Sequence, residues 1–272
     1  MFEIENVRKV FDGGTVALDG VTLTIGPGEH VAFIGPSGAG KTTLFRILNL
    51  TLRPTAGGVR LDGADVSGLG ESELRKARRR IGTIYQQGNL VGRLHVVHNV
   101  LAGNLGRWST AEALVSLLRP RDVESAHRAL SRVGIPEKLY TRTDQLSGGQ
   151  QQRVAIARLL VQDPDIILAD EPVSSVDPSL AVSIVTLLRD LSAESRKTLL
   201  INLHSVDLAL ASFPRIVGIR DGRVFFDLAP GKVTEELLQA LYAGQEETEG
   251  QIGWFNELLP ASGACRPLQL RK

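Results

Sequence analysis

The sequence predicts an α/β fold with a mainly parallel sheet, an antiparallel β part and an inserted helical segment. Strand and helix patterns alternate from Pro164 onward, which is typical of a parallel sheet covered by helices. A short apolar strand runs into a glycine-rich loop and then a helix between residues 30 and 50. The stretch between residues 86 and 145 holds mostly helical patterns. With 272 residues, of which 43% are hydrophobic, the chain can bury a full core.

The N-terminal part reads as strands separated by turns. Residues 2–7 and 21–25 alternate apolar and polar positions, as half-buried strands do, whereas residues 30–35 form a nearly continuous apolar run that ends in glycine. Residues 42–50 have helical spacing. Residues 57–66 predict a hairpin or turn segment with Asp62-Gly63 at its bend.

The middle and C-terminal parts continue this order. Helical patterns at residues 110–118 and 122–134 belong to the predicted insertion, and the isoleucines and leucine of residues 165–171 predict a strand buried on both faces. Further elements then alternate, namely helix 178–194, strand 198–204, helix 206–213 and hairpin 215–227 around Asp221-Gly222. The tail after Gln245 has no clear period, and we expect it to be loosely ordered.

Composition restricts the classes of partner. The formal net charge of +1 gives no global reason to expect nucleic acid or an anionic membrane as a partner. Basic residues gather between Arg75 and Arg80, but no aromatic residue is interleaved with them, so a solvated helix face is favoured over a nucleic-acid site. No apolar run approaches the roughly 20 residues that cross a bilayer. We therefore expect membrane association only through another protein.

The most specific motif is GPSGAGKT, from Gly35 to Thr42, which lies after a predicted strand and before a predicted helix. Its glycines let backbone N–H groups curl around a β-phosphate, and Lys41 supplies positive charge for the β- and γ-phosphate oxygens. Thr42 can ligate Mg²⁺. The predicted nucleotide-binding residues of this loop are Gly35, Pro36, Ser37, Gly38, Ala39, Gly40, Lys41, Thr42 and Thr43.

Polar residues at the ends of predicted strands extend this site. Asp170 is expected to hold Mg²⁺ through water, and Glu171 to orient and polarise the attacking water. Gln86 could reach Mg²⁺ and the water, and His204 could hold the reacting groups from the same sheet edge. Phe11 is a candidate for stacking on adenine. The alternatives are a solvated strand end for the acids, polar surface for the glutamine, a structural histidine and a core phenylalanine.

The stretch LSGGQ, residues 146–150, precedes a predicted helix. Ser147 can cap that helix, but a cap and a turn account for one glycine and not for both. Uncrowded N–H groups at a helix start form an anion site. The residues assigned to that site are Ser147, Gly148, Gly149 and Gln150.

These motifs together resemble the ATP-binding cassette (ABC) ATPases, of which LSGGQ is the signature. The resemblance covers roughly residues 1–243 and implies a P-loop NTPase core with an ABC-type helical subdomain. The expected ATPase domain is 1–245, with its core at 1–85 and 160–245, its helical subdomain at 86–159 and an extension at 246–272.

The resemblance also implies how the site is completed. It implies an ATP-bound head-to-tail homodimer, in which the phosphate loop of one copy and the LSGGQ of the other enclose ATP and Mg²⁺. Asp177 would connect the two halves; the family's usual Leu before this aspartate is Val176 here.

Residues 86–110 resemble more narrowly the phosphonate importer ATPases. This resemblance implies a subunit at the cytoplasmic face of the cell membrane, bound to permease subunits and served by a periplasmic or extracellular solute-binding protein. Phosphonates or phosphite would be the cargo. Two alternatives stay open: a non-transport ABC ATPase, and an accessory ATPase of a soluble phosphonate-degrading assembly.

Overall fold

The computed structural model describes residues 1–85, 89–173 and 176–244 of the chain. These residues divide into two compact units, one formed by Met1–Gly68 and the chain from Leu200 onward, the other by Leu69–Leu199. Gln86 and the tail after Gln245, for which the sequence makes predictions, lie outside the described residues.

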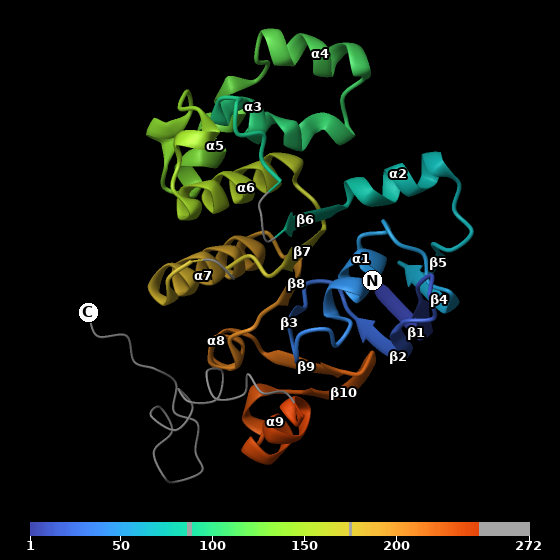
Figure 1. Cartoon of the computed structure of the whole chain (residues 1–272). Coiled ribbons are helices and arrows are strands. Elements are labelled where there is room, and N and C mark those ends of the chain that lie inside the picture. The colour runs from blue at the N-terminus through green and yellow to red at the C-terminus, as the bar shows by residue number, and fades with distance from the viewer. Residues whose placement is uncertain (86–88, 174–175, 245–272) are drawn as a thin grey trace. The chain divides into compact units, whose positions relative to one another are not determined.

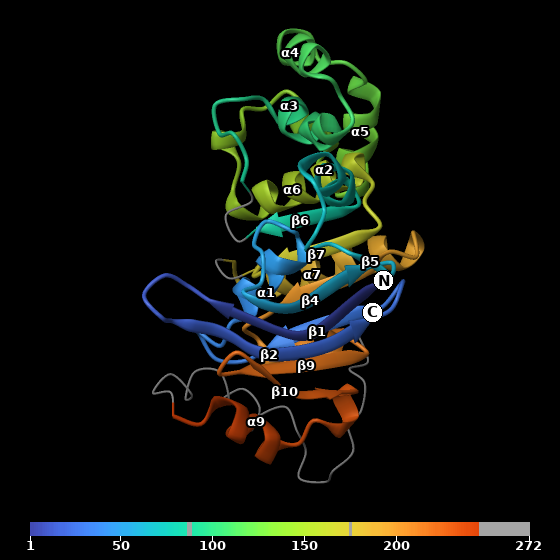
Figure 2. The same ribbon diagram turned by 90° about the vertical axis from the view of Figure 1, so that its right-hand side faces the viewer.

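The first unit contains an antiparallel sheet and a mainly parallel one. The antiparallel sheet has the order β2-β1-β4-β5, and in the second sheet β3 pairs with β9 in parallel and β9 with β10 antiparallel. Figure 2 shows α9 beside β9 and β10. The elements of this unit are β1 (Phe2–Val10), β2 (Val16–Ile25), β3 (His30–Ile34), α1 (Lys41–Leu48), β4 (Ala56–Leu61), β5 (Ala64–Asp65), α8 (Val206–Ser212), β9 (Arg215–Arg220), β10 (Arg223–Leu228), a 3₁₀ turn (Pro230–Lys232) and α9 (Glu235–Tyr242).

Both predicted hairpins are confirmed. Asp62 and Gly63 connect β4 to β5, and Asp221 and Gly222 connect β9 to β10. All four residues have positive φ, between 50° and 80°. Such dihedrals twist a two-residue turn in the direction that matches the flanking strands, which is why Asp-Gly is a strong hairpin signal.

The second unit combines a parallel strand pair with a group of helices. β6 pairs with β7 in parallel, from Ile81 beside Ile166 to Tyr85 beside Asp170. Helices α3, α5 and α6 pack against one another, and α4 lies on the far side of α3 from α6 (Figures 1 and 2). The elements are α2 (Glu71–Arg79), β6 (Ile81–Tyr85), α3 (Val96–Leu101), α4 (Thr110–Leu118), α5 (Val123–Arg132), α6 (Gly148–Gln162), β7 (Ile166–Asp170) and α7 (Pro178–Glu194), with 3₁₀ turns at Ala102–Gly106, Pro136–Lys138 and Thr143–Gln145; β8 (Thr198–Asn202) runs from this unit into the first.

The fold class predicted from the sequence is confirmed. The structure contains parallel strands, an antiparallel sheet and a group of helices, and the basic run before β6 forms the mostly exposed helix α2. The short helices α3 and α9 were not predicted. Each has a buried face, formed by Val96, Val97 and Val100 in α3 and by Leu238, Leu241 and Tyr242 in α9. With six residues α3 is too short for a clear period, whereas Leu238, Leu241 and Tyr242 of α9 have the i, i+3, i+4 spacing of a helix, a signal that sequence reasoning missed.

Candidate nucleotide-binding site

The phosphate loop leaves the carboxyl end of β3 and enters α1. Residues 31–34 of β3 are fully buried, so the start of the loop is held by the core. Gly35 has a φ of 144°, and a Cβ there would lie 2.0 Å from the carbonyl oxygen of Ile219. Gly40 has a φ of 102°, and its Cβ would lie 2.4 Å from the carbonyl oxygen of Ala17. Only glycine fits at these two positions, because both the dihedral and the space exclude a side chain.

Lys41 places its ammonium group inside this loop. Its side chain is only 4% exposed, and Nζ donates hydrogen bonds to the carbonyl oxygens of Gly35 at 2.6 Å and Pro36 at 2.9 Å. A buried cation needs such partners, because losing its hydration without them is costly. The loop thus holds a positive charge in advance, next to exposed Ser37 and Gly38. This arrangement suits an anionic ligand such as a phosphate chain.

The turn between β9 and β10 is hydrogen-bonded to the phosphate loop. The N–H of Gly222 donates to the carbonyl oxygen of Ala39 at 3.0 Å, and the carbonyl oxygen of Gly222 accepts from the N–H of Asp19 at 2.9 Å. The sequence predicts this turn but gives no sign that it touches the phosphate loop, since the contact joins residues far apart in the chain.

His204 and Phe11 belong to the same unit as the loop. The N–H of Leu203 donates to the carbonyl oxygen of Phe33 at 3.0 Å, so half-buried His204 follows a residue bonded to β3, near the edge that the loop leaves. Phe11 lies in the turn after β1, is 36% exposed and has the Lys9 ammonium 5.3 Å from its ring centre. Its ring is therefore not part of the core, and its stacking on adenine stays a prediction.

Of the two predicted acids, Asp170 ends strand β7 in the second unit and Glu171 follows it directly. Residues 166–169 are buried, and Asp170, which pairs in register with Tyr85, is the last residue of the strand. Half-buried Glu171 has a φ of 52°, in the left-handed region. This region is unfavourable for a residue with a side chain, and such strain of about 1–3 kcal/mol persists where the surrounding structure imposes it, often at functional sites.

The LSGGQ stretch begins helix α6. The Ser147 hydroxyl accepts from the N–H of Gln150 at 3.3 Å, and the Gln150 side chain accepts from the N–H of Ser147 at 3.1 Å. This reciprocal pair is a capping box. A Cβ on Gly149 would lie 2.4 Å from the Leu180 side chain of α7, whereas a Cβ on Gly148 would meet nothing within 4 Å. Packing explains Gly149, but the fold does not require a glycine at position 148.

Comparison with known proteins identifies the family. Residues 18–174 match the model of the family described as ABC transporter. The chain belongs to the ABC transporter family.

Its relatives and structural neighbours agree with this assignment. It is 45% identical over 253 residues, 93% of this chain and 98% of the relative, to the phosphonates import ATP-binding protein PhnC 3 of Halalkalibacterium halodurans. It is 48% identical over 89% of its length to PhnC 1 of Pseudomonas aeruginosa, 91% of which is covered. A dimeric post-hydrolysis structure of the cassette MJ0796 bound to ADP and Pi matches with a TM-score of 0.72 and 34% identity, over 85% of this chain and 99% of that one.

As a nucleotide-binding ABC cassette, the chain places Asp177 at the start of α7. One oxygen of its carboxylate accepts from the N–H of Leu180 at 2.9 Å and from the Ser179 hydroxyl at 2.6 Å. These hydrogen bonds, chiefly that of Ser179, lower the pKa of Asp177. The carboxylate therefore caps α7, and Leu180 of the same helix contacts the signature at Gly149. A role between two ABC subunits stays a prediction.

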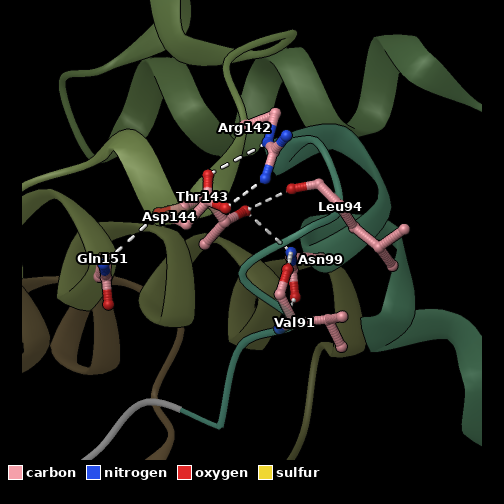
Figure 3. A network of polar contacts seen from close by, with 7 residues as sticks. All are labelled: Val91, Leu94, Asn99, Arg142, Thr143, Asp144 and Gln151. Carbon is pink, nitrogen blue, oxygen red and sulfur yellow. Dashed lines mark hydrogen bonds and ion pairs between the residues drawn. The ribbon is translucent and has the colours of Figure 1, made fainter.

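A polar network around buried Asn99 and Thr143 joins the segment before α3 to Gln151, which directly follows the signature in α6 (Figure 3). The Asn99 side chain donates to the carbonyl oxygen of Val91 at 3.0 Å and to the Thr143 hydroxyl at 2.9 Å. The Thr143 hydroxyl donates to the carbonyl oxygen of Leu94 at 2.9 Å, and its own carbonyl oxygen accepts from Gln151 of α6 at 3.4 Å. Sequence reasoning missed this network, because an isolated Asn or Thr gives no sign of its partners.

Proposed function

We propose that this chain is the ATP-hydrolysing subunit of an ABC importer and energises uptake of phosphonates, or of related phosphorus oxyanions such as phosphite, through a separate permease. The observation that carries the ATPase part is the buried Lys41 ammonium inside a glycine-lined loop. The cargo rests on relatives named phosphonates import ATP-binding proteins, which match over most of this chain.

In the proposed reaction a water oxygen attacks the γ-phosphorus of ATP, and the bond to the bridging oxygen breaks, leaving ADP and phosphate. Lys41 exchanges its carbonyl partners for phosphate oxygens. Glu171 orients the water, and the proton that the water releases as the new P–O bond forms passes to the Glu171 carboxylate, while Gln86 and His204 position water and phosphate. The strained backbone of Glu171 supports this role, because a residue held in an unfavourable conformation has its side chain directed from a defined backbone position.

Mg²⁺, when bound, neutralises charge on the β- and γ-phosphates. The Thr42 hydroxyl, exposed at the start of α1, the Asp170 carboxylate through water, and Gln86 are its proposed protein ligands. Oxygen ligands of this kind suit Mg²⁺, which usually takes only one or two groups from the protein and the rest from phosphates and water.

We propose that ATP closes a homodimer in which residues 147–150 of one copy face the phosphate loop of the other. The open space beside Gly148 supports this arrangement. A side chain would fit there within the fold, so the glycine is explained by the space that a partner's nucleotide needs. ATP then acts as a ligand that favours the closed dimer, and hydrolysis releases it.

The membrane partner is proposed to bind the helical subdomain at residues 86–110, the stretch that resembles the phosphonate importer ATPases, and at the adjoining helix α4. None of the helices within the described residues is long and apolar enough to cross a bilayer. Large apolar side chains are exposed in and before α4, with Leu118 90% exposed. By helical spacing Leu114, Val115, Leu117 and Leu118 fall on one side of α4, and a contiguous exposed apolar face marks a contact surface for another protein. Leu105, in the 3₁₀ turn before α4, is exposed as well. A permease would hold the subunit at the cytoplasmic face of the membrane and receive cargo from a solute-binding protein.

Uptake of a radiolabelled alkylphosphonate by phosphate-starved cells tests the proposal. We expect a chromosomal Glu171→Gln allele to abolish this uptake while uptake of inorganic phosphate stays intact. Unchanged alkylphosphonate uptake would contradict the cargo. Isolation of the chain with soluble enzymes instead of a permease would contradict the transport role.

A further inference from the structure

The C-terminal helix α9 contacts the phosphate loop at its first residue. The N–H of Gly35 donates a buried hydrogen bond of 3.1 Å to the hydroxyl oxygen of Tyr242, the last residue of α9. The two residues are 207 positions apart and belong to the same unit. No motif in the sequence signals this contact.

Both backbone polar groups of Gly35 are bonded to side chains. Its N–H is bonded to Tyr242, and its carbonyl oxygen accepts from Lys41 at 2.6 Å. A buried N–H without an acceptor is unfavourable, so the Tyr242 hydroxyl favours this position of the loop. A Cβ on Gly35 would lie 2.0 Å from the Ile219 carbonyl oxygen, so the backbone of β9 packs closely against this residue.

Tyr242 is itself held firmly. The Arg220 guanidinium, at the end of β9, donates to the carbonyl oxygens of Ala240 and Ala243. These carbonyls lie at the C-terminal end of α9, where a helix leaves such groups without internal partners. Burial raises the pKa of Tyr242 to about 12, although the Gly35 N–H lowers it. The hydroxyl therefore stays neutral, and available as an acceptor, throughout the physiological pH range.

We propose that Tyr242 is a positioning residue for nucleotide binding, which keeps the Gly35 peptide in place while Lys41 leaves its carbonyl partners for phosphate. This inference rests on the proposed ATPase function. The bond from Gly35 to Tyr242 does not involve the Lys41 ammonium, so it persists when that group turns to the ligand. Tyr242 thereby raises the fraction of molecules whose loop can accept ATP.

The test is Tyr242→Phe in the full-length chain, which removes only the hydroxyl. Tyr140→Phe is the matched control, because Tyr140 is 67% exposed and lies in the other unit. We expect Tyr242→Phe to raise KM for ATP by about 3- to 10-fold, because the apparent affinity falls when only a fraction of the molecules hold the loop in the form that binds ATP. The value of kcat should stay within about twofold of wild type. Tyr140→Phe should change neither value.

Hydrogen exchange of the nucleotide-free chain gives a second readout. The amides of residues 33–35, 37 and 38 should exchange faster in Tyr242→Phe and regain protection with saturating ATP. Should Tyr242→Phe fail to fold, Arg220→Gln, which releases the end of α9, should raise KM in the same direction. An unchanged KM, or a fall in kcat with unchanged exchange, overturns the proposal. Absence of ATP hydrolysis by the wild-type chain would instead overturn the proposed function, and exchange at Gly35 would still report the contact with Tyr242.

Discussion

Glu171 combines a strained backbone with a carboxylate directly after the buried strand β7. Glu171→Gln keeps the shape of the side chain but removes the negative oxygen that polarises water. We expect ATP binding to persist and steady-state hydrolysis to fall by about 100- to 10,000-fold, the contribution of a general base. Phosphate release and equilibrium nucleotide binding measure the two effects. Exposed Glu137→Gln is the control, and normal turnover by Glu171→Gln would refute the assignment.

We expect Lys41 to contribute to ATP affinity, because its ammonium group already lies inside the phosphate loop. Lys41→Ala should weaken ATP affinity by about 10- to 100-fold, the usual value of hydrogen bonds to a charged group. Titration with a fluorescent ATP analogue measures this loss. Lys232→Ala, an exposed lysine in the same unit, should leave affinity unchanged. Equal affinities for wild type and Lys41→Ala would count against the role of the loop.

At the scale of elements, the Asn99–Thr143 network fixes the segment before α3 against the approach to α6. Thr143→Val keeps the shape but leaves buried partners with fewer hydrogen bonds. We expect the free energy of unfolding to fall by about 1–3 kcal/mol, measured by urea denaturation. Thr110→Val, at an exposed position of α4, should cost far less. Similar losses in both variants would show that the network adds no stability of its own.

At the scale of the whole molecule, the proposed dimer depends on the open position beside Gly148. Gly148→Leu should fold normally, since a Cβ there meets nothing within 4 Å, but it should block entry of the partner's nucleotide. In a Glu171→Gln background with ATP, sedimentation should show dimers, and adding Gly148→Leu should return them to monomers. Gly231→Leu, at another open glycine, is the control. Persistent dimers in the Gly148→Leu variant would contradict the head-to-tail arrangement.

The sequence by itself determined the local elements and the main motifs. Dihedral preferences and the spacing of apolar residues are properties of residues close together in the chain. They are sufficient to predict the Asp-Gly turns, the buried strand β7 and the glycines of the phosphate loop. The sequence alone was therefore sufficient to propose Lys41, Glu171 and the LSGGQ stretch as site residues. The six-residue helix α3 was not predicted because its buried face is too short to show a period, and the helical spacing within α9 was overlooked.

Only the tertiary structure decided which distant residues support the site. Gly149 packs against Leu180, Gly222 bonds to Ala39, and Gly35 bonds to Tyr242. A tyrosine near the C-terminus has the same local pattern whether its hydroxyl faces water or the phosphate loop. Packing between segments far apart in the chain decides which group its hydroxyl meets. Once buried, the hydroxyl and the Gly35 N–H each need a hydrogen-bond partner. No local preference encodes such a pairing.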